Sequence, residues 1–598
     1  MNDRLTVVVH DWSGGEQSDG LLQFLSKVPG ADSLEIVVVL PEKGAASGDL
    51  PPGVTPVAAG NRSSGGARKN AGLQACRGDA LLLSEHARPR PADFIERLSS
   101  LATAMPGLGA AGCTRVDPAG TVVDSGAHVL FPDCDLYRVE GGKRDMNQYH
   151  YAREVHGVDS GCMYVTRRAF ESAGGFNEDY SDAYSDADFC LRVQEKGYRV
   201  ACAGEVRLVV PSPDEGGPGA FEDRDRADFA SRWNGYLSSR YRTRVMWHSW
   251  INAPTGYAVS SQYLVLALES LGVDVRYGFV YGVEEPANDD SRIMEVRRKP
   301  KDLDIPQVVY GQGDVFFKNS GKYRIGYSML EVTGIPGNWA EQANALDEIW
   351  VPSRFNQETF SQSGVVRPIK VMPLGVDIHH FHPFIRSRRL DDRFVFLSVF
   401  EWGERKAPEI LLKAFNQEFS KSDDAVLLLK VINTDPGVNI EQQVEALRLR
   451  PDGAPIVVVQ NHDVPSYQMG SLYCSSDCFV LPTRGEGWGM PTLEAMACGL
   501  PVISTDWSAQ TEFFNDQVGY PIRVRELIPA VAKCPYYTGY RWADPDPEHL
   551  ASLMRYVYEN REEARAKGLK ASIAAREKWS WEKAAGRIRD RLLEVSGT

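Results

Sequence analysis

Short apolar runs rich in β-branched residues alternate with longer stretches of helical periodicity along most of the sequence. Strands separated by ten or more helical residues are typical of βαβ units, in which a helix joins two parallel strands. The predicted strands are 5–9, 34–40, 80–83, 244–247, 394–399, 426–431, 456–459 and 478–481. The alternation therefore predicts an α/β protein whose parallel sheets are covered by helices on both faces.

Two breaks in this pattern divide the chain. The segment 211–219, Pro-Ser-Pro-Asp-Glu-Gly-Gly-Pro-Gly, cannot form a regular element, and a second break lies at 379–392. A chain of 598 residues also exceeds what a single hydrophobic core supports. We therefore expect three α/β domains, over residues 1–240, 241–388 and 389–598. We expect the last helices, from 548 to 593, to pack back across the second domain.

The composition limits which partners the chain is expected to bind and in which compartment it is expected to work. A net charge of −14 argues against binding nucleic acid by phosphate neutralisation, so basic groups that handle an anionic substrate must gather locally. No apolar run is long enough to span a bilayer, and the first residues lack the anatomy of a signal peptide. The ten cysteines form no Cys-x-x-Cys pair and are typical of reduced thiols. We expect a cytoplasmic protein without a transmembrane segment, and leave peripheral membrane association and oligomeric state open.

The segment 482–506 carries the densest set of chemically informative residues. It follows the strand 478–481, so its glycines fall at a strand-to-helix turn at the carboxyl edge of a sheet, where open α/β sheets bind ligands. Pro491 suits the first helical turn, so backbone N–H groups and a helix N-terminus would face an anion such as phosphate. Glu486 and Glu494 bracket this turn. Either carboxylate alone could be a solvated surface charge, but the combination favours a binding site.

This segment resembles the Glu-x7-Glu signature of family-four retaining glycosyltransferases, which have the GT-B fold of two facing Rossmann-like domains. Further similarities extend over residues 244–593 and comprise an acceptor-side glycine loop and helix (254–275), the stretch before the interdomain linker (347–355 and 373–377), a donor-phosphate loop (398–408) and the start of a returning helix (579–581). The resemblance implies a hexosyltransferase of polysaccharide biosynthesis, which uses a UDP- or GDP-linked sugar. The acceptor would be a glycan, a lipid-linked molecule or a protein, and the anomeric configuration would be retained.

The resemblance also implies roles for individual residues. Arg405 and Lys406 would pair with the donor diphosphate and neutralise the charge that builds as the glycosidic bond breaks. Glu486 would accept hydrogen bonds from the transferred sugar, and Glu494 from the ribose. Because two cations and helix dipoles would cover the diphosphate, the resemblance implies no metal at this site. The alternative for Arg405 and Lys406 is an ordinary surface pair. Further donor contacts are implied for Gly487, Trp488, Gly489, Met490, Thr492 and Gly256.

Two departures from the family pattern concern the reacting centre. The family often has a Gly-Arg near residues 399–400, and this arginine is absent. It often has a histidine beside the reacting carbon, yet the corresponding region 310–331 contains none. Asp314 and Glu331 are candidate substitutes, which leaves the sugar and the acceptor open.

Three histidines at 379, 380 and 382 resemble a metal cluster. They lie in a Gly-Val-Asp-x-x-x-Phe-x-Pro context that resembles an ordinary interdomain segment of the family. A structural role is therefore expected for them.

Residues 1–240 resemble a different group, the family-two glycosyltransferases with the GT-A fold, through segments 61–79 and 157–199. Where that family has a metal-binding Asp-x-Asp, this chain has Glu85-His86-Ala87, so a divalent cation would lose a ligand and its need here is open. The usual Asp-Asp after the second strand is replaced by 40–43. Asp186 stands where the family keeps its catalytic base, with Asp188 beside it, although a helix-capping or surface aspartate is an equal alternative. We interpret this domain as a diverged relative that is inactive or uses Glu85 and His86 in an altered way.

Three hypotheses follow. The C-terminal site alone performs transfer, or both halves are active, or the N-terminal domain is a module that binds the acceptor or a partner. The Asp186 position favours two activities, and the incomplete metal motif favours the module.

Overall fold

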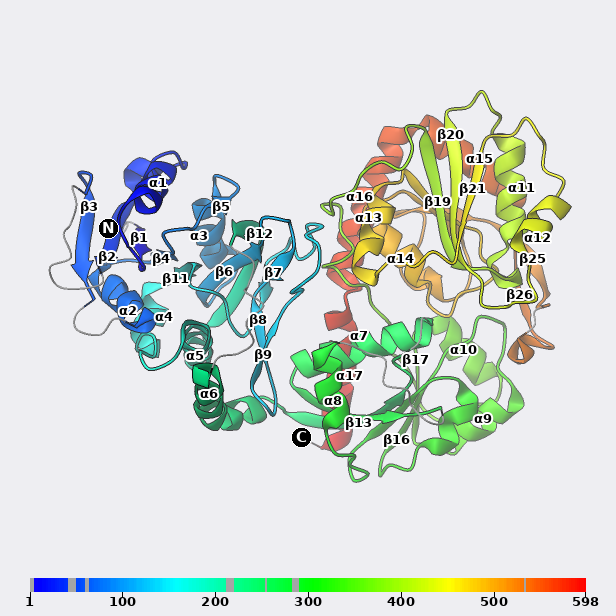
Figure 1. Cartoon of the computed structure of the whole chain (residues 1–598). Coiled ribbons are helices and arrows are strands. Elements are labelled where there is room, and N and C mark those ends of the chain that lie inside the picture. The colour runs from blue at the N-terminus through cyan, green and yellow to red at the C-terminus, as the bar shows by residue number, and fades with distance from the viewer. Residues whose placement is uncertain are drawn as a thin grey trace. The chain divides into compact units, whose positions relative to one another are not determined.

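The computed structural model describes residues 5–40, 50–59, 64–210, 220–252, 255–281, 290–531 and 534–597. The chain divides into two compact units, Met1–Arg240 and Tyr241–Thr598, each with its own sheets (Figure 1). The predicted features at 41–43, 61–63, 211–219 and Pro254 lie outside the described residues. Within the described residues, no helix is both long and apolar enough to cross a membrane.

The first unit is built on a ten-stranded mixed sheet of order β10-β12-β6-β11-β4-β1-β2-β3, with β5 on β12 and β7 on β6; β8 and β9 form a separate hairpin. Its strands are β1 (Thr6–Val9), β2 (Glu35–Leu40), β3 (Val54–Ala58), β4 (Ala80–Leu83), β5 (Pro89–Arg90), β6 (Leu108–Val116), β7 (Val122–Asp124), β8 (Ala127–Leu130), β9 (Asp135–Arg138), β10 (Arg153–Glu154), β11 (Cys162–Val165) and β12 (Arg199–Val209). Its helices are α1 (Glu16–Leu25), α2 (Gly65–Ala75), α3 (Phe94–Ala104), α4 (Arg167–Ala173), α5 (Asp182–Glu195) and α6 (Ala220–Ser239).

The prediction of parallel sheets is right for only part of this unit. Strands β1, β2, β3 and β4 are parallel, but β11 runs antiparallel to both β4 and β6. The reason is the connection: residues 117–161, between β6 and β11, hold short strands and turns where a parallel crossover would need a helix. Burial on both faces holds as predicted, because Val7 and Val9 join one apolar core and Val8 the other.

The second unit contains two six-stranded parallel sheets, the middle sheet (β14-β13-β15-β16-β17-β18) and the C-terminal sheet (β21-β20-β19-β22-β23-β24). The C-terminal sheet has the Rossmann order 3-2-1-4-5-6. Two parallel Rossmann-like sheets in one unit agree with the GT-B fold that the family resemblance implies. The strands are β13 (Thr243–Ser249), β14 (Val273–Phe279), β15 (Gln307–Tyr310), β16 (Arg324–Tyr327), β17 (Glu348–Val351), β18 (Ile369–Val371), β19 (Phe394–Glu401), β20 (Ala425–Ile432), β21 (Ile456–Gln460), β22 (Cys478–Leu481), β23 (Val502–Thr505) and β24 (Tyr520–Ile522).

The helices of this unit cover both sheets. Of the last helices, all of which are expected from the sequence to pack back across the second domain, α17 returns to the middle sheet, whereas α15 packs on α11 and α16 on α14. Helix α17 packs on α7 and β13, and Trp581 at its start stacks on Tyr263 of α7 with ring centroids 5.2 Å apart. The helices are α7 (Gly256–Ser270), α8 (Ser291–Arg298), α9 (Gly337–Asn344), α10 (Arg354–Gln362), α11 (Pro408–Glu418), α12 (Ile440–Ala446), α13 (Met469–Cys474), α14 (Met490–Ala497), α15 (Pro547–Glu559), α16 (Arg561–Lys578) and α17 (Trp581–Ser596).

A hairpin that the sequence did not predict also bridges the two sheets. We call it the strap: strands β25 (Val524–Pro529) and β26 (Arg541–Pro545) with the described residues between them. It follows the last strand of the C-terminal sheet, yet its turn lies beside α9 of the middle sheet (Figure 1). Tyr537 and Trp542 of the strap are buried in the same apolar cluster as Trp339 of α9. The strap therefore completes a core of the middle sheet with side chains from a distant part of the chain.

Candidate active site

The C-terminal sheet reverses its strand order between β19 and β22, and both predicted charge motifs follow these two strands. Strand β19 leads into the short 3-10 turn Glu404–Lys406, and β22 leads into the glycine-rich loop 482–489. Ligands of open α/β sheets bind outside the carboxyl ends of the strands at such a switch point. The topology therefore brings Arg405, Lys406 and Glu486 together, although 80 residues separate Lys406 from Glu486.

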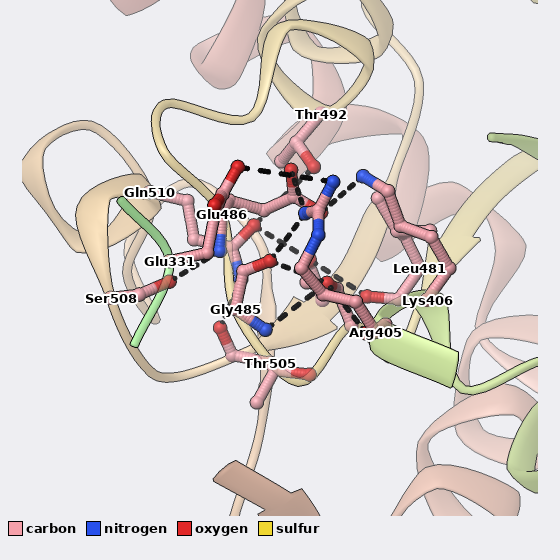
Figure 2. A network of polar contacts seen from close by, with 12 residues as sticks. Glu331, Arg405, Lys406, Leu481, Gly485, Glu486, Thr492, Thr505, Ser508 and Gln510 are labelled. Carbon is pink, nitrogen blue, oxygen red and sulfur yellow. Dashed lines mark hydrogen bonds and ion pairs between the residues drawn. The ribbon is translucent and has the colours of Figure 1, made fainter. Parts of the chain in front are cut away.

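Glu486 is the centre of a buried charge cluster (Figure 2). Lys406 Nζ lies 2.5 Å from Glu486 Oε1, and Arg405 Nη1 lies 3.3 Å from Glu486 Oε2. Lys406 and Glu486 are only 7% and 5% exposed. Burial disfavours the charged carboxylate, but Lys406 and Arg405 outweigh burial and lower the pKa of Glu486. Glu486 is therefore held as a carboxylate, whereas burial and the neighbouring Arg405 lower the pKa of the Lys406 ammonium group.

Glu331 reaches this cluster from the middle sheet. Its Oε1 lies 3.9 Å from Arg405 Nη2, and its Oε2 accepts a hydrogen bond of 2.8 Å from the Tyr537 hydroxyl of the strap. A Cβ on Gly485 would lie 2.3 Å from the Glu331 carbonyl oxygen, and a Cβ on Gly487 would lie 2.8 Å from Met329. These glycines are therefore required because the segment 329–331 packs directly on the loop. The cluster thus contains two cations, Arg405 and Lys406, and two carboxylates, Glu331 and Glu486.

The loop 482–489 is held by hydrogen bonds that fix Glu486. The Glu486 N–H donates to Ser508 Oγ at 2.8 Å, and Arg405 Nη1 donates to the Gly485 carbonyl at 2.6 Å. Gly489 has φ +99°, a conformation that favours glycine, and it precedes the first residue of α14. Sequence reasoning missed Ser508, whose role depends on a contact between segments 22 residues apart.

The N-termini of α7 and α14 approach each other between the two sheets. A Cβ on Gly256, the first residue of α7, would lie 3.5 Å from Met490 Cε, at the start of α14. The first N–H groups of a helix have no intrahelical partner, and the helix dipole adds positive potential there. Two such ends that meet at the glycine-rich loop make a region that favours an anion.

Glu494 lies one turn into α14, away from the Lys406 cluster. Its Oε2 accepts a 2.9 Å hydrogen bond from the buried Tyr473 hydroxyl, a partner that sequence reasoning missed. Burial raises the pKa of Glu494 to about 7. The carboxyl is therefore poised to titrate near neutral pH.

Two residues predicted as donor contacts point their side chains into the core. Trp488 is 2% exposed and packs against Phe513 and Trp579. Thr492 is fully buried, and its hydroxyl donates to Gln510 Oε1 at 3.5 Å. Their backbones lie in the loop and in the first turn of α14, so a donor contact would come from main-chain atoms.

The candidate residues of the first unit are occupied by internal partners. Asp186 is buried, and it pairs with Lys69 Nζ at 2.7 Å and accepts from the Ser160 N–H at 2.8 Å. It is thus neither a helix cap nor a surface residue. Asp188 is fully buried and holds Arg192 at 2.7 Å and Trp233 Nε1 at 3.0 Å.

Glu85 and His86 follow strand β4 of the first unit's sheet. Glu85 accepts from the Ser13 N–H at 2.9 Å and from the Ser13 and Ser18 hydroxyls at 2.8 Å. Burial opposes ionisation, but these hydrogen bonds outweigh it and lower the pKa of Glu85. The His86 side chain is half-exposed, with Nδ1 2.5 Å from Gln17 Oε1.

The three clustered histidines lie in the turn that follows β18. His380 Nδ1 lies 2.8 Å from Asp377 Oδ2, and His382 Nδ1 accepts from the Phe384 N–H at 3.2 Å. Across the described part of the chain, no group of three or more His, Cys, Asp or Glu side chains is arranged to hold a metal ion.

Comparison with known proteins identifies the segment that carries this cluster. The family model described as "Glycosyl transferases group 1" matches residues 391–559, which include Arg405, Lys406, Glu486 and Glu494. Residues 391–559 belong to the group 1 glycosyltransferases.

Similar proteins match parts of this chain. The O-antigen biosynthesis protein RfbC of Myxococcus xanthus is 33% identical over 109 residues, which are 17% of this chain and 8% of the relative. The D-inositol 3-phosphate glycosyltransferase of Paenarthrobacter aurescens is 29% identical over 157 residues, which are 25% of this chain and 37% of the relative. The matches thus span less than two fifths of these relatives' lengths. A sucrose-phosphate synthase structure from Thermosynechococcus elongatus aligns with TM-score 0.45 and 16% identity, over 60% of this chain and all of that chain.

Proposed function

We propose that the unit Tyr241–Thr598 transfers a sugar from a UDP- or GDP-linked donor to an acceptor with retention of anomeric configuration. The observation that carries the proposal is the convergence of Arg405, Lys406 and Glu486 at the switch point of the C-terminal sheet. The family of residues 391–559 supports the same reaction class.

In this proposal the diphosphate lies beside Arg405 and Lys406 and between the N-termini of α7 and α14. The charges of Arg405, Lys406, Glu331 and Glu486 cancel, so the diphosphate has to draw the two cations partly away from the carboxylates. The helix ends supply the remaining positive potential. As the glycosidic bond breaks, the diphosphate gains charge, and cations fixed in advance stabilise that charge more than they stabilise the bound donor.

The two glutamates of the Glu-x7-Glu motif bind different parts of the donor in this proposal. Glu494, on the helix beside Tyr473, accepts from the ribose hydroxyls. Glu486, between the two cations, accepts from hydroxyls of the transferred sugar. Gly256, Gly487, Gly489 and the first turn of α14 at Met490 allow the donor to approach the backbone.

A screen of nucleotide-sugars against the full-length chain tests the proposal. A ligand at a hundredfold its dissociation constant adds about 2.7 kcal/mol to the free energy of unfolding, which raises the melting temperature measurably. We expect UDP- or GDP-sugars to raise it and ATP to have a smaller effect. Absence of a shift with every nucleotide-sugar, at concentrations up to several millimolar, would contradict the proposal.

Transfer is expected to persist in EDTA at within about twofold of its untreated rate, because Arg405, Lys406 and two helix ends balance the diphosphate charge. The measurement is nucleotide release with and without EDTA, followed by addition of manganese. Loss of activity in EDTA with recovery in manganese would show that the chemistry was assigned to the wrong unit or that the phosphate site is misassigned.

Donor affinity is expected to depend on pH through Glu494. The ribose hydroxyls bind a carboxylate more strongly than a protonated carboxyl, and with a pKa of about 7 only about a tenth of the carboxyl is ionised at pH 6. Affinity at pH 6 should therefore be about tenfold weaker than at pH 8. Glu494→Gln controls for titration of the nucleotide itself, because it removes the carboxylate and leaves the phosphates unchanged. Equal pH profiles for the wild type and Glu494→Gln would exclude this role.

For residues 1–240, whose sequence resembles the GT-A fold, we propose a binding module rather than a second transferase. A general base must be free to accept a proton from the acceptor, yet Asp186 is buried against Lys69 at 2.7 Å. Glu85 likewise holds two serines that a metal would have to displace. If the first unit only binds, it transfers no sugar when the C-terminal site is disabled. We therefore expect that the full-length Lys406→Ala variant shows no residual manganese-dependent transfer.

A further inference from the structure

Aromatic side chains and polar side chains with accepting oxygens gather at the carboxyl edge of the middle sheet. This sheet runs β14-β13-β15-β16, and the residues that follow these strands are Tyr281, Trp250, Gln312 with Asp314, and Glu331. The Trp250 and Tyr281 ring centroids lie 5.9 Å apart, and the Tyr281 hydroxyl lies 3.3 Å from the Gln312 N–H. Four adjacent parallel strands thus present aromatic rings and polar oxygens along a single edge.

The strap adds two tyrosines to this edge. The Tyr536 hydroxyl lies 2.7 Å from Asp314 Oδ2 and 3.3 Å from Gln312 Oε1, and the Tyr537 hydroxyl lies 2.8 Å from Glu331. The strap is anchored on the middle sheet, because the Thr333 N–H donates to the Arg541 carbonyl and the Arg541 N–H donates to Thr333 Oγ1, each at 3.0 Å. Tyr536 and Tyr537 are therefore fixed parts of the edge.

The edge ends at the charge cluster, because Glu331 lies 3.9 Å from Arg405. A molecule bound along Trp250, Tyr281, Tyr536 and Asp314 would extend to the place where the donor sugar is proposed to lie.

The chemistry of the edge matches a saccharide. Sugar rings have apolar C–H faces, which pack on aromatic rings, and equatorial hydroxyls, which hydrogen-bond to carboxylate and amide oxygens. Trp250 is 39% exposed, a large fraction for tryptophan. Asp314 Oδ1 has no hydrogen-bond partner among the described residues, and because this atom is buried a ligand hydroxyl reaches it only when the side chain turns.

The charge of the edge selects among acceptors. Asp314 and Glu331 are acidic, and the nearby Lys318 directs its ammonium group to the Val280 carbonyl. Glu331 is paired with Arg405, so Asp314 is the carboxylate that would repel a phosphate or acidic group bound beside it.

We propose that the acceptor is a neutral saccharide that binds along Trp250, Tyr281 and Tyr536, with hydroxyls on Gln312 and Asp314. Glu331 orients the hydroxyl that reacts. The anomeric carbon exchanges its bond to the diphosphate oxygen for a bond to the acceptor oxygen, and the acceptor proton leaves on the diphosphate. This inference rests on the proposed function, because it assigns the second substrate of the same site.

The test uses the labelled full-length chain with UDP or GDP on an array of neutral, acidic and phosphorylated oligosaccharides, with inositol phosphate as a soluble competitor. We expect capture by neutral glycans and no competition by inositol phosphate. Trp250→Ala should weaken capture about tenfold or more, and Tyr536→Phe should weaken it several-fold. Phe384→Ala is the matched control, because it removes another exposed aromatic ring, 53% exposed, from the segment after β18.

Nucleotide affinity measured on the same proteins separates the possible failures. A wild-type chain that binds no nucleotide contradicts the proposed function itself. A chain that binds nucleotide but is captured only by phosphorylated or acidic glycans, or by no glycan, overturns the proposal of a neutral acceptor. Undiminished capture by both Trp250→Ala and Tyr536→Phe overturns the edge as the binding site and assigns capture to other residues.

Discussion

Replacement of Lys406 with alanine is expected to lower kcat about a hundredfold to a thousandfold at saturating donor, the usual cost of removing one preorganised donor from a transition-state charge. The ammonium group is buried 2.5 Å from Glu486, and once donor binding has drawn it toward the diphosphate it needs little further reorganisation when the leaving group gains charge. Exclusion of water strengthens its interaction with the diphosphate. Because the leaving-group charge develops in the transition state, the loss should fall mainly on kcat.

Lys413→Ala is the matched control for this variant. Lys413 is exposed on α11, seven residues along the chain, and the same substitution there should leave kcat unchanged. The melting temperature of Lys406→Ala should also be compared with that of the wild type, because removal of one member of a buried ion pair can destabilise the fold. Turnover within about threefold of wild type in a folded Lys406→Ala protein would remove the lysine from the site.

The sequence was sufficient to predict which residues of the C-terminal sheet lie together. Arg405 and Lys406 lie in the loop after the predicted strand 394–399, and Glu486 lies in the loop after the predicted strand 478–481. In an open parallel sheet the carboxyl ends of neighbouring strands meet at one edge. Once the two strands are adjacent, Arg405, Lys406 and Glu486 are brought near one another, but the family resemblance assigns the cations to the diphosphate and does not predict their ion pairs with Glu486. The resemblance to a known family supplied the adjacency.

The partners that the sequence could not predict all depend on long-range contacts. Tyr537 lies 206 residues from Glu331, and Tyr536 lies 222 residues from Asp314. The strap has no hydrophobic period or motif that would predict its docking on the middle sheet. In the first unit, the pair of Lys69 and Asp186 spans 117 residues, and nothing in the sequence indicates that Asp186 lies in a buried ion pair. An alternation of strands and helices also cannot show that β11 is antiparallel, since a long irregular connection permits either direction.

The two glutamates of the motif are expected to respond in opposite ways to the same substitution. Glu494→Gln should weaken nucleotide binding about tenfold to a hundredfold, because it removes the charge from hydrogen bonds to the ribose, and hydrogen bonds to charged groups contribute about 1.5–3 kcal/mol each. The variant also loses a carboxylate acceptor for Tyr473, but the amide oxygen can replace it. The measurement is the dissociation constant for UDP or GDP at pH 8, where the wild-type carboxyl is ionised.

Glu486→Gln should leave nucleotide binding unchanged or make it severalfold tighter, and it should slow transfer about tenfold to a hundredfold. The carboxylate competes with the diphosphate for Arg405 and Lys406, so its neutralisation gives the cluster one net positive charge and a stronger attraction for phosphate. Transfer slows because the ionised oxygens that orient the sugar hydroxyls, and that oppose the positive charge developing on the sugar ring, are lost. Tighter binding with slower turnover in one variant cannot come from general damage to the fold. Weaker nucleotide binding in Glu486→Gln than in Glu494→Gln would reverse the assignment of ribose and sugar between the two residues.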